Sequence, residues 1–214
     1  MVEQQLPKLT TGVRFPSPAP FPAGDGRRPR MSNHVYPVVA SYRSAPGDAV
    51  VHSLQVNVVA MDPPRALAQG LLIAKHWLRV QHPSASLLSD RAKCGAAQSP
   101  ASGPSLILMG TSDIVQSVVF PARIDSEPGE RLGEILAGLD AERMDAVLFN
   151  CADLTYMNTV GLTSLAAHVK RLRLHLFQVP EPVMKVFEIV GLSRYLTILP
   201  GLEESLAAIP PRSA

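Results

Sequence analysis

The stretch from Leu148 to Leu165, LFNCADLTYMNTVGLTSL, constrains the fold of this chain more than any other. It opens with the apolar composition of a buried strand, continues through turn residues and ends in an apolar helix face. Leu162, Leu165, Ala166 and Val169 recur at spacings of 3, 4 and 7, which is the period of one helix face. The sequence therefore predicts a strand, a tight turn and a helix in immediate succession.

Thr159 lies at or just before the start of that helix. The first backbone N–H groups of a helix have no partners within the helix, and the helix dipole is positive there. A hydroxyl at this place can cap the helix, or it can receive a phosphate that the same N–H groups would stabilise. Two interpretations follow. Thr159 is a regulatory phosphorylation site, or it is a helix-capping residue with no regulatory role.

The second half of the chain contains further elements in a regular order. Apolar runs at 105–109 and 114–120 flank turn residues and predict a hairpin. Asp125 or Ser126 is expected to cap a helix that buries Leu132, Ile135, Leu136 and Leu139. The remaining expected elements are a strand at 146–151, a strand within 172–179, a helix whose apolar face is Val183, Val186, Phe187 and Val190, a strand at 195–199 and a helix at 202–209. Gly191 is expected to end the third helix with a positive φ angle. This order predicts an α/β fold with helices covering a mixed sheet.

Four segments in this order resemble the STAS domain, the fold of bacterial anti-sigma factor antagonists. The family's central loop reads Asp-Ser-Ser/Thr-Gly-Leu after an apolar strand, and here the loop is Asn158-Thr159-Val160-Gly161-Leu162. Thr159 matches the family's phosphate acceptor, whereas Asn158 and Asn150 stand where the family usually has Asp. FPARIDSEPGERLGEIL at 120–136 and VPEPVMKVFEIVGLSRYLTIL at 179–199 are similar to the family's flanking segments. The resemblance covers residues 105–209.

This resemblance implies a STAS-like mixed β-sheet of about five strands with four helices over residues 104–210. It implies a regulatory binding protein that captures a kinase-type anti-sigma factor, with phospho-control at Thr159. The alternative it leaves open is a STAS subunit of a bacterial lipid-transport ABC system that docks on the ATPase. The partner-binding surface it implies consists of Asn158, Thr159, Gly161, Leu162, Thr163, Asp125 and Ser126. The family usually has a longer segment between Gly161 and Val179, so we expect that region to be less well packed than its neighbours.

The first 103 residues differ from the rest in charge and proline content. They carry 11 Lys/Arg and 5 Asp/Glu, a net charge of +6, whereas residues 104–214 have a net charge of −4. They also hold 12 of the 20 prolines, which disfavour helix interiors and central strands. We expect a largely unstructured extension over 1–103. Residues 50–59 have strand composition, 65–81 have a broad apolar helix face, and 83–103 have linker composition. A sensor module remains the alternative for 31–103.

The string Val13-Arg14-Phe15-Pro16 is what the TΨC-loop sequence of a tRNA gene would encode in one reading frame. The hypothesis is that translation starts downstream of it and that this segment is not made, with Met31 and Met109 as alternative starts. The cluster at Arg27, Arg28 and Arg30 has no interleaved aromatic residues, and we interpret it as a solvated basic tail and not as a nucleic-acid patch.

The sequence contains no motif for an enzyme, a cofactor or a metal site. It has no phosphate-binding glycine loop, no nucleophile elbow and no His/Cys/Asp cluster at ligand spacing. We interpret His168, His175 and Asp153 as surface residues. The chain has no apolar run of about 18 residues and no signal peptide. Cys94 and Cys151 favour a reduced, cytoplasmic protein. We therefore expect a cytoplasmic binding protein that is not an enzyme, inserts into no membrane and binds no nucleic acid.

Overall fold

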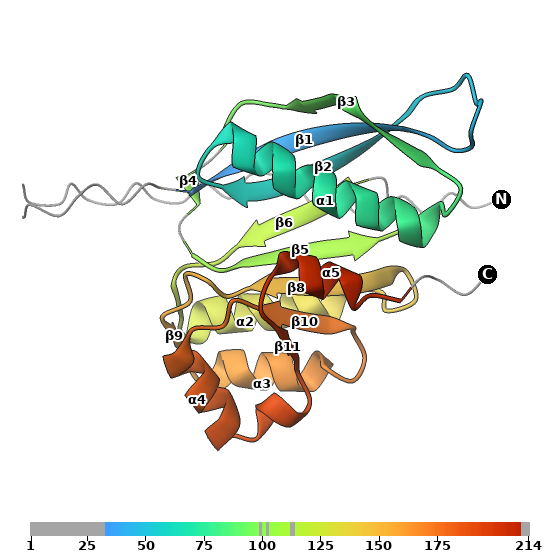
Figure 1. Ribbon diagram of the computed structural model, residues 1–214. Coiled ribbons are helices and arrows are strands. Elements are labelled where there is room, and N and C mark those ends of the chain that lie inside the picture. Colours follow the sequence, from blue (N-terminus) through green and yellow to red (C-terminus); the bar gives the residue numbers. More distant parts are fainter. Residues whose placement is uncertain (1–32, 99, 102, 112–113, 211–214) are drawn as a thin grey trace, which may run out of the picture. The chain divides into compact units, whose positions relative to one another are not determined.

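The computed structural model describes residues 33–98, 100–101, 103–111 and 114–210 (Figure 1). The hypotheses on residues 1–30, on Met31 and on the turn residues Ser112 and Asp113 lie outside the described residues. The described residues belong to one compact unit. None of the helices in the described part of the chain has the length and apolar composition to cross a membrane.

The mixed α/β class is confirmed. The described strands form a nine-stranded sheet in the order β11-β10-β8-β5-β6-β2-β1-β3, with β4 paired to β1. The strands expected in the second half are β5 (Ser105–Gly110), β6 (Ile114–Val119), β8 (Met144–Asn150), β10 (Leu174–Phe177) and β11 (Thr197–Leu199). The helices are α2 (Ser126–Gly138), α3 (Thr159–His168), α4 (Glu181–Ile189) and α5 (Leu202–Ala207). The predicted hairpin is present, because β5 and β6 pair antiparallel. Gly191 has a φ of 74° and ends α4 as expected, ahead of the 3₁₀ turn η1 (Leu192–Arg194).

The expectation of little structure in residues 31–103 is corrected for the residues described there. They form β1 (Asn33–Arg43), β2 (His52–Ala60), α1 (Pro63–Gln81), β3 (Ser86–Cys94) and β4 (Pro100–Ala101). The physical reason is alternation with period two: the even-numbered residues from 36 to 42 in β1 and from 54 to 60 in β2 are buried against α1. The stretch interpreted as a linker contains β3, whose Leu87 and Cys94 pack against the same core.

The two halves of the sheet share one topology. In each half a hairpin is followed by a helix and then by a strand antiparallel to the first strand of the hairpin, as in β1-β2-α1-β3 and β5-β6-α2-β8. The halves meet where β2 and β6 run parallel, pairing Gln55 with Ile114 and Val56 with Val115. The edge strand of the second half is therefore covered by the first half.

Two cores lie on opposite faces of this sheet. The α1-side core joins α1 and α5 with Ile107, Met109 and Leu148, whereas the α2-side core joins α2, α3 and α4 with Leu106 and Phe149. Neighbouring strand residues such as Leu106 and Ile107 thus enter different cores, as the alternation of a strand requires. Figure 1 shows α1 and α5 on one face and α2 and α3 on the other. Central strand β8 is buried on both faces, as its apolar sequence predicted.

Candidate functional site

A short two-stranded parallel sheet places the starts of α2 and α3 side by side. Its strands are β7 (Arg123–Ile124) and β9 (Tyr156–Met157), which directly precede the two helices. The N–H of Asn158 donates to the carbonyl of Ile124 over 3.0 Å and extends this pairing to the first residue of the turn. Pairing of only two residues is too short to produce a periodic pattern, so the sequence did not reveal it.

Asn158 is the N-cap of α3, which corrects the interpretation of Thr159 as the capping residue. The Oδ1 atom of Asn158 accepts a hydrogen bond from the N–H of Gly161 over 3.1 Å. Its Nδ2 atom donates to the Oγ atom of Ser126 over 3.3 Å. The side chain therefore satisfies one of the first N–H groups of α3 and bridges to the start of α2.

Thr159 is the first residue of α3, and its side chain is exposed. Its hydroxyl makes no hydrogen bond to any residue in the described part of the chain. Thr163 is exposed one helical turn further along, and the i, i+4 spacing places both threonines on one helix face. A free hydroxyl at a helix N-terminus is geometrically accessible to a modifying enzyme or to a docking partner.

Gly161 and Leu162 lie beneath this surface. Leu162 is buried in the α2-side core. A Cβ atom on Gly161 would lie 2.8 Å from Cγ of Met157 and 3.0 Å from Cγ2 of Ile124. A Cβ atom on Gly129 of α2 would lie 2.8 Å from the backbone nitrogen of Gly161. Both glycines allow α2 and α3 to pack closely, so their role is to shape the surface and not to contact a partner directly.

The start of α2 contributes the polar edge of the surface. Asp125 and Ser126 are both exposed, as the expected partner-binding surface requires. Asp125 is the N-cap of α2 by position, but its side chain makes no capping hydrogen bond. Instead its Oδ1 atom lies 3.6 Å from Nη2 of Arg123, whose guanidinium stacks 4.3 Å from the ring centroid of Tyr156. The sequence analysis did not single out Arg123 or Tyr156.

The histidine residues correct the surface interpretation. His175 is buried, its Nδ1 atom lies 3.2 Å from the carbonyl oxygen of Ser205 in α5, and burial lowers its pKa. His168 is partly buried beside Arg171, and partial burial lowers its pKa. Asp153 is exposed as expected and accepts a 3.2 Å hydrogen bond from Nδ2 of Asn33 in β1. Within the described ranges no three His, Cys, Asp or Glu side chains are placed to hold a metal ion.

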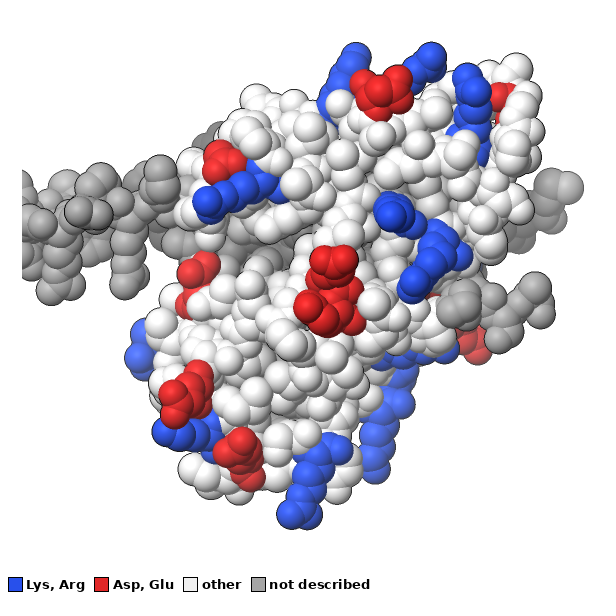
Figure 2. Space-filling model, viewed as in Figure 1, with Lys and Arg blue, Asp and Glu red and all other residues white. Residues whose placement is uncertain are grey.

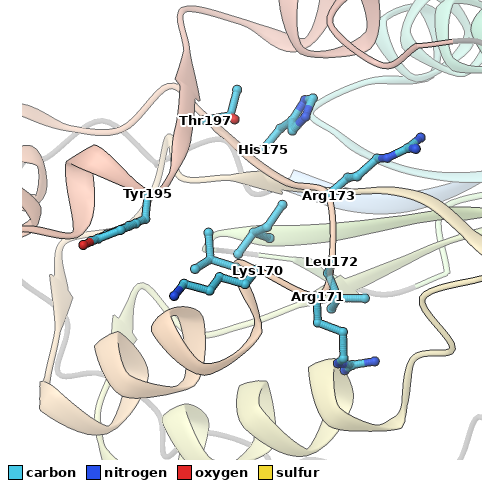
Figure 3. A pocket seen from close by; sticks show the side chains of 9 residues that line it. Lys170, Arg171, Leu172, Arg173, His175, Tyr195 and Thr197 are labelled. Carbon is cyan, nitrogen blue, oxygen red and sulfur yellow. The ribbon is translucent and has the colours of Figure 1, made fainter.

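A surface hollow of about 370 Å³ lies at the opposite end of α3 from Thr159 (Figure 3). Its lining runs from Val169 to His175 and includes Tyr195 and Thr197. This is the region in which the short segment between α3 and β10 predicted weaker packing. Arg171 has a structural role here, because its guanidinium donates hydrogen bonds to the carbonyl oxygens of Leu136 and Leu139 at the end of α2. Figure 3 shows it turned toward that helix.

The comparisons with known proteins identify one segment of the chain. Residues 106–205 match the family model described as the STAS domain. No curated protein and no solved structure matches the chain. The matched segment runs from β5 into α5 and contains every residue of the site at the starts of α2 and α3.

Proposed function

Because residues 106–205 of this protein are a STAS domain, a regulatory protein-interaction module, we propose that the chain acts like an anti-sigma factor antagonist. In this proposal it is a cytoplasmic binding protein that captures an anti-sigma factor of the serine/threonine-kinase type. Capture of that partner would release a sigma factor for transcription. The proposed contact surface is the exposed area at the starts of α2 and α3.

The observation that carries this proposal is the bond between Asn158 and Ser126. It fixes two helix starts that lie 32 residues apart in sequence against each other. As a result, the exposed side chains of Asp125, Thr159 and Thr163 lie on neighbouring helix starts and not on separate loops. Elements that are held rigidly by a small sheet and a side-chain bridge are suited to docking, because little conformational entropy is lost on binding.

Phosphorylation of Thr159 would act as the switch. A phosphate adds a charge of about −1.5 to −2 at neutral pH. The helix dipole and the first N–H groups of α3 would stabilise this charge within the protein. Against a docked partner, the same charge would repel acidic groups and would cost desolvation. The unmodified protein is therefore the binding form in this proposal, and the phosphorylated protein is the released form.

The test uses a purified anti-sigma factor of the serine/threonine-kinase type from the same organism, incubated with this protein and ATP. Phosphopeptide mass spectrometry should find the modification on Thr159, and T159A should abolish it. T159E should weaken partner binding at least tenfold in calorimetry. The matched control is T197A, an exposed threonine on β11, which should leave both readouts unchanged. Equal binding by T159E and the unaltered protein would refute the switch.

A second candidate is favoured by the amide at Asn158. The STAS resemblance places an acidic residue beside the acceptor, whereas both polar atoms of Asn158 are used to hold the helix starts together. Such a surface suits permanent docking without phosphate chemistry, as in a STAS subunit that clamps the ATPase of a lipid-transport ABC system. Co-purification with an ABC ATPase, together with an unmodified Thr159 in cells, would favour this candidate over the first.

A further inference from the structure

Helix α4 exposes apolar side chains that the sequence predicted to be buried. The helix was expected to bury Val183, Val186, Phe187 and Val190, and it buries Val183 and Phe187 in the α2-side core. Val186 is 36% exposed, Val190 is 50% exposed and Ile189, which is next to it, is 84% exposed. These three residues are spaced i, i+3 and i+4, so they form one outward face of the helix.

The chain after α4 adds an aromatic residue to this face. Gly191 ends the helix, and Leu192 and Leu196 turn inward and are buried in the α2-side core. Tyr195, between them, is 62% exposed and borders the hollow described above. We call Val186, Ile189, Val190 and Tyr195 the α4 patch.

Basic side chains border the α4 patch. Lys170 lines the same hollow as Tyr195, and Arg194 is the residue before Tyr195, whereas Arg173 lines the hollow but points away from Tyr195 (Figure 3). Neither Lys170 nor Arg194, which we call the basic rim, has a carboxylate within 4 Å in the described part of the chain. Figure 2 shows Lys and Arg side chains at the edge of the molecule beside the end of α3, an acidic group over α5, and both acidic and basic side chains in the region of α4.

The acidic residues of α4 lie away from the patch. Glu181 forms a 2.8 Å ion pair with Lys185 one turn along the helix. Glu188 follows Val186 by two residues, which places it about 160° away around the helix axis. Lys170, Lys185 and Arg194 outnumber Glu181 and Glu188 here, so the surface around the α4 patch has a small excess of positive charge.

We propose that the α4 patch and the basic rim bind an anionic membrane surface. Apolar side chains beside lysine and arginine match the two layers of a lipid surface, which are acyl chains below and negatively charged headgroups above. Tyrosine suits the boundary between the two, because its ring is apolar and its hydroxyl is polar.

The shape of the surface favours lipid over a partner protein helix. An amphipathic helix docks in an apolar groove, whereas the side chains of the α4 patch protrude, with Ile189 the most exposed. The hollow beside the patch is lined by Lys170, Arg171 and Arg173 and so is not an apolar groove. Figure 3 shows Lys170 and Tyr195 extending toward the same side in that view.

The test is co-sedimentation of the full chain with vesicles of phosphatidylcholine alone and with vesicles of phosphatidylcholine mixed with the anionic lipid phosphatidylglycerol. We expect binding to the anionic vesicles only, weakening as salt is raised, since surface charges are screened. I189E should reduce the association constant at least tenfold. V50E is the matched control, because Val50 is 58% exposed in the loop between β1 and β2, and it should bind like the unaltered protein.

A second pair of variants tests the charge. K170A/R194A should lose about 30-fold in association constant, since each basic residue near an anionic surface contributes about fivefold. K75A/R91A removes two exposed basic residues of the first half of the chain and should lose less than threefold. Thermal melting checks that every variant is folded.

Three outcomes would overturn the proposal. The first is that the unaltered protein fails to sediment with either vesicle. The second is that V50E loses as much binding as I189E, which would make binding non-specific. The third is concentration-dependent self-association that I189E abolishes while vesicle binding is absent, which would make the patch an interface between copies. The α4 patch shares no residue with the surface at the starts of α2 and α3, and Lys170 lies beyond the other end of α3 from Thr159, so T159E should leave vesicle binding unchanged and the two proposals can fail separately.

Discussion

The side-chain amide of Asn158 donates a hydrogen bond to the hydroxyl oxygen of Ser126 over 3.3 Å and so joins the first residues of α3 and α2. The same side chain caps α3 through the N–H of Gly161. One residue thus caps the start of α3 and also helps to hold it against the start of α2. The candidate docking surface depends on this double role.

Replacement of Asn158 should destabilise the protein through the lost cap. We expect N158A to lower the free energy of unfolding by about 1 kcal/mol, with a range of roughly 0.5–2. N158D keeps the acceptor for the N–H of Gly161 and adds a negative charge at a helix N-terminus, so it should lose less than half as much. Urea denaturation followed by circular dichroism measures both. If N158A and N158D were equally destabilised, the cap would not be the source of the effect.

The close packing of α2 and α3 should make Gly161 intolerant of a side chain. We expect G161A to cost about 1–3 kcal/mol, because the new Cβ atom would crowd Met157 and Ile124. The control is G138A near the end of α2, where a Cβ atom would meet nothing within 4 Å. G138A should be neutral or stabilising by up to about 1 kcal/mol, since alanine has less conformational entropy to lose. Thermal denaturation of G161A and G138A measures the difference. A G161A variant as stable as the unaltered protein would contradict the prediction.

The buried His76 should make stability depend on pH. Burial, aided by the nearby positive charge of Arg79, lowers the pKa of His76 from 6.5 to about 4. Between these values the unfolded chain binds a proton that the folded protein does not, so stability is full above pH 6.5 and falls as the pH is lowered toward 4. The loss from this residue is at most about 3 kcal/mol.

H76L removes this titration, and it also removes a buried Nε2 atom that has no hydrogen-bond partner. The free energy of unfolding of the variant should therefore fall less steeply between pH 6.5 and 4. The difference in slope corresponds to up to one bound proton. Urea denaturation at intervals of pH measures the slope. An unchanged slope would show that other groups, such as His175, account for the dependence.

Trp77 should couple the first half of the chain to the second. Its Nε1–H donates to the carbonyl of Gly110 over 2.8 Å, and its ring is buried in the core shared by both halves. W77F would leave that buried carbonyl without its partner and would create a small cavity, at a cost of about 2–4 kcal/mol.

Calorimetry should show one unfolding transition for the unaltered protein and one at lower temperature for W77F. Two separate transitions would instead mean that residues 33–101 and the STAS domain unfold independently. The proposed domain boundary at residue 104 concerns only which part of the sequence is related to the STAS family. We predict that the parts on either side of it unfold as one cooperative unit.

Much of the second half could be predicted from its sequence because its signals are local. The spacing of Leu132 and Leu136 marks the buried face of α2, and both residues are buried. Gly191 ends α4 with a positive φ angle, which its lack of a Cβ atom makes favourable. The start of α3 within one residue of Thr159 followed from the turn residues and the apolar spacing after them. The STAS resemblance relied on the same local features.

The remaining features depended on contacts between distant segments. Buried residues alternate with period two in β1 and β2, in a part of the chain that is rich in proline. These residues form a core only because β2 pairs with β6 and α1 packs against α5. His175 is buried because α5 covers it.

The sequence alone therefore determined where strands, turns and helices begin in the second half, because hydrophobic period and backbone preference act between residues a few positions apart. Tertiary structure alone decided that Asn158 bridges to Ser126, which apolar residues of α4 stay exposed and that the first half completes the sheet. Those outcomes depend on which surfaces meet, and Asn158 lies beside Ser126 where β7 and β9 pair.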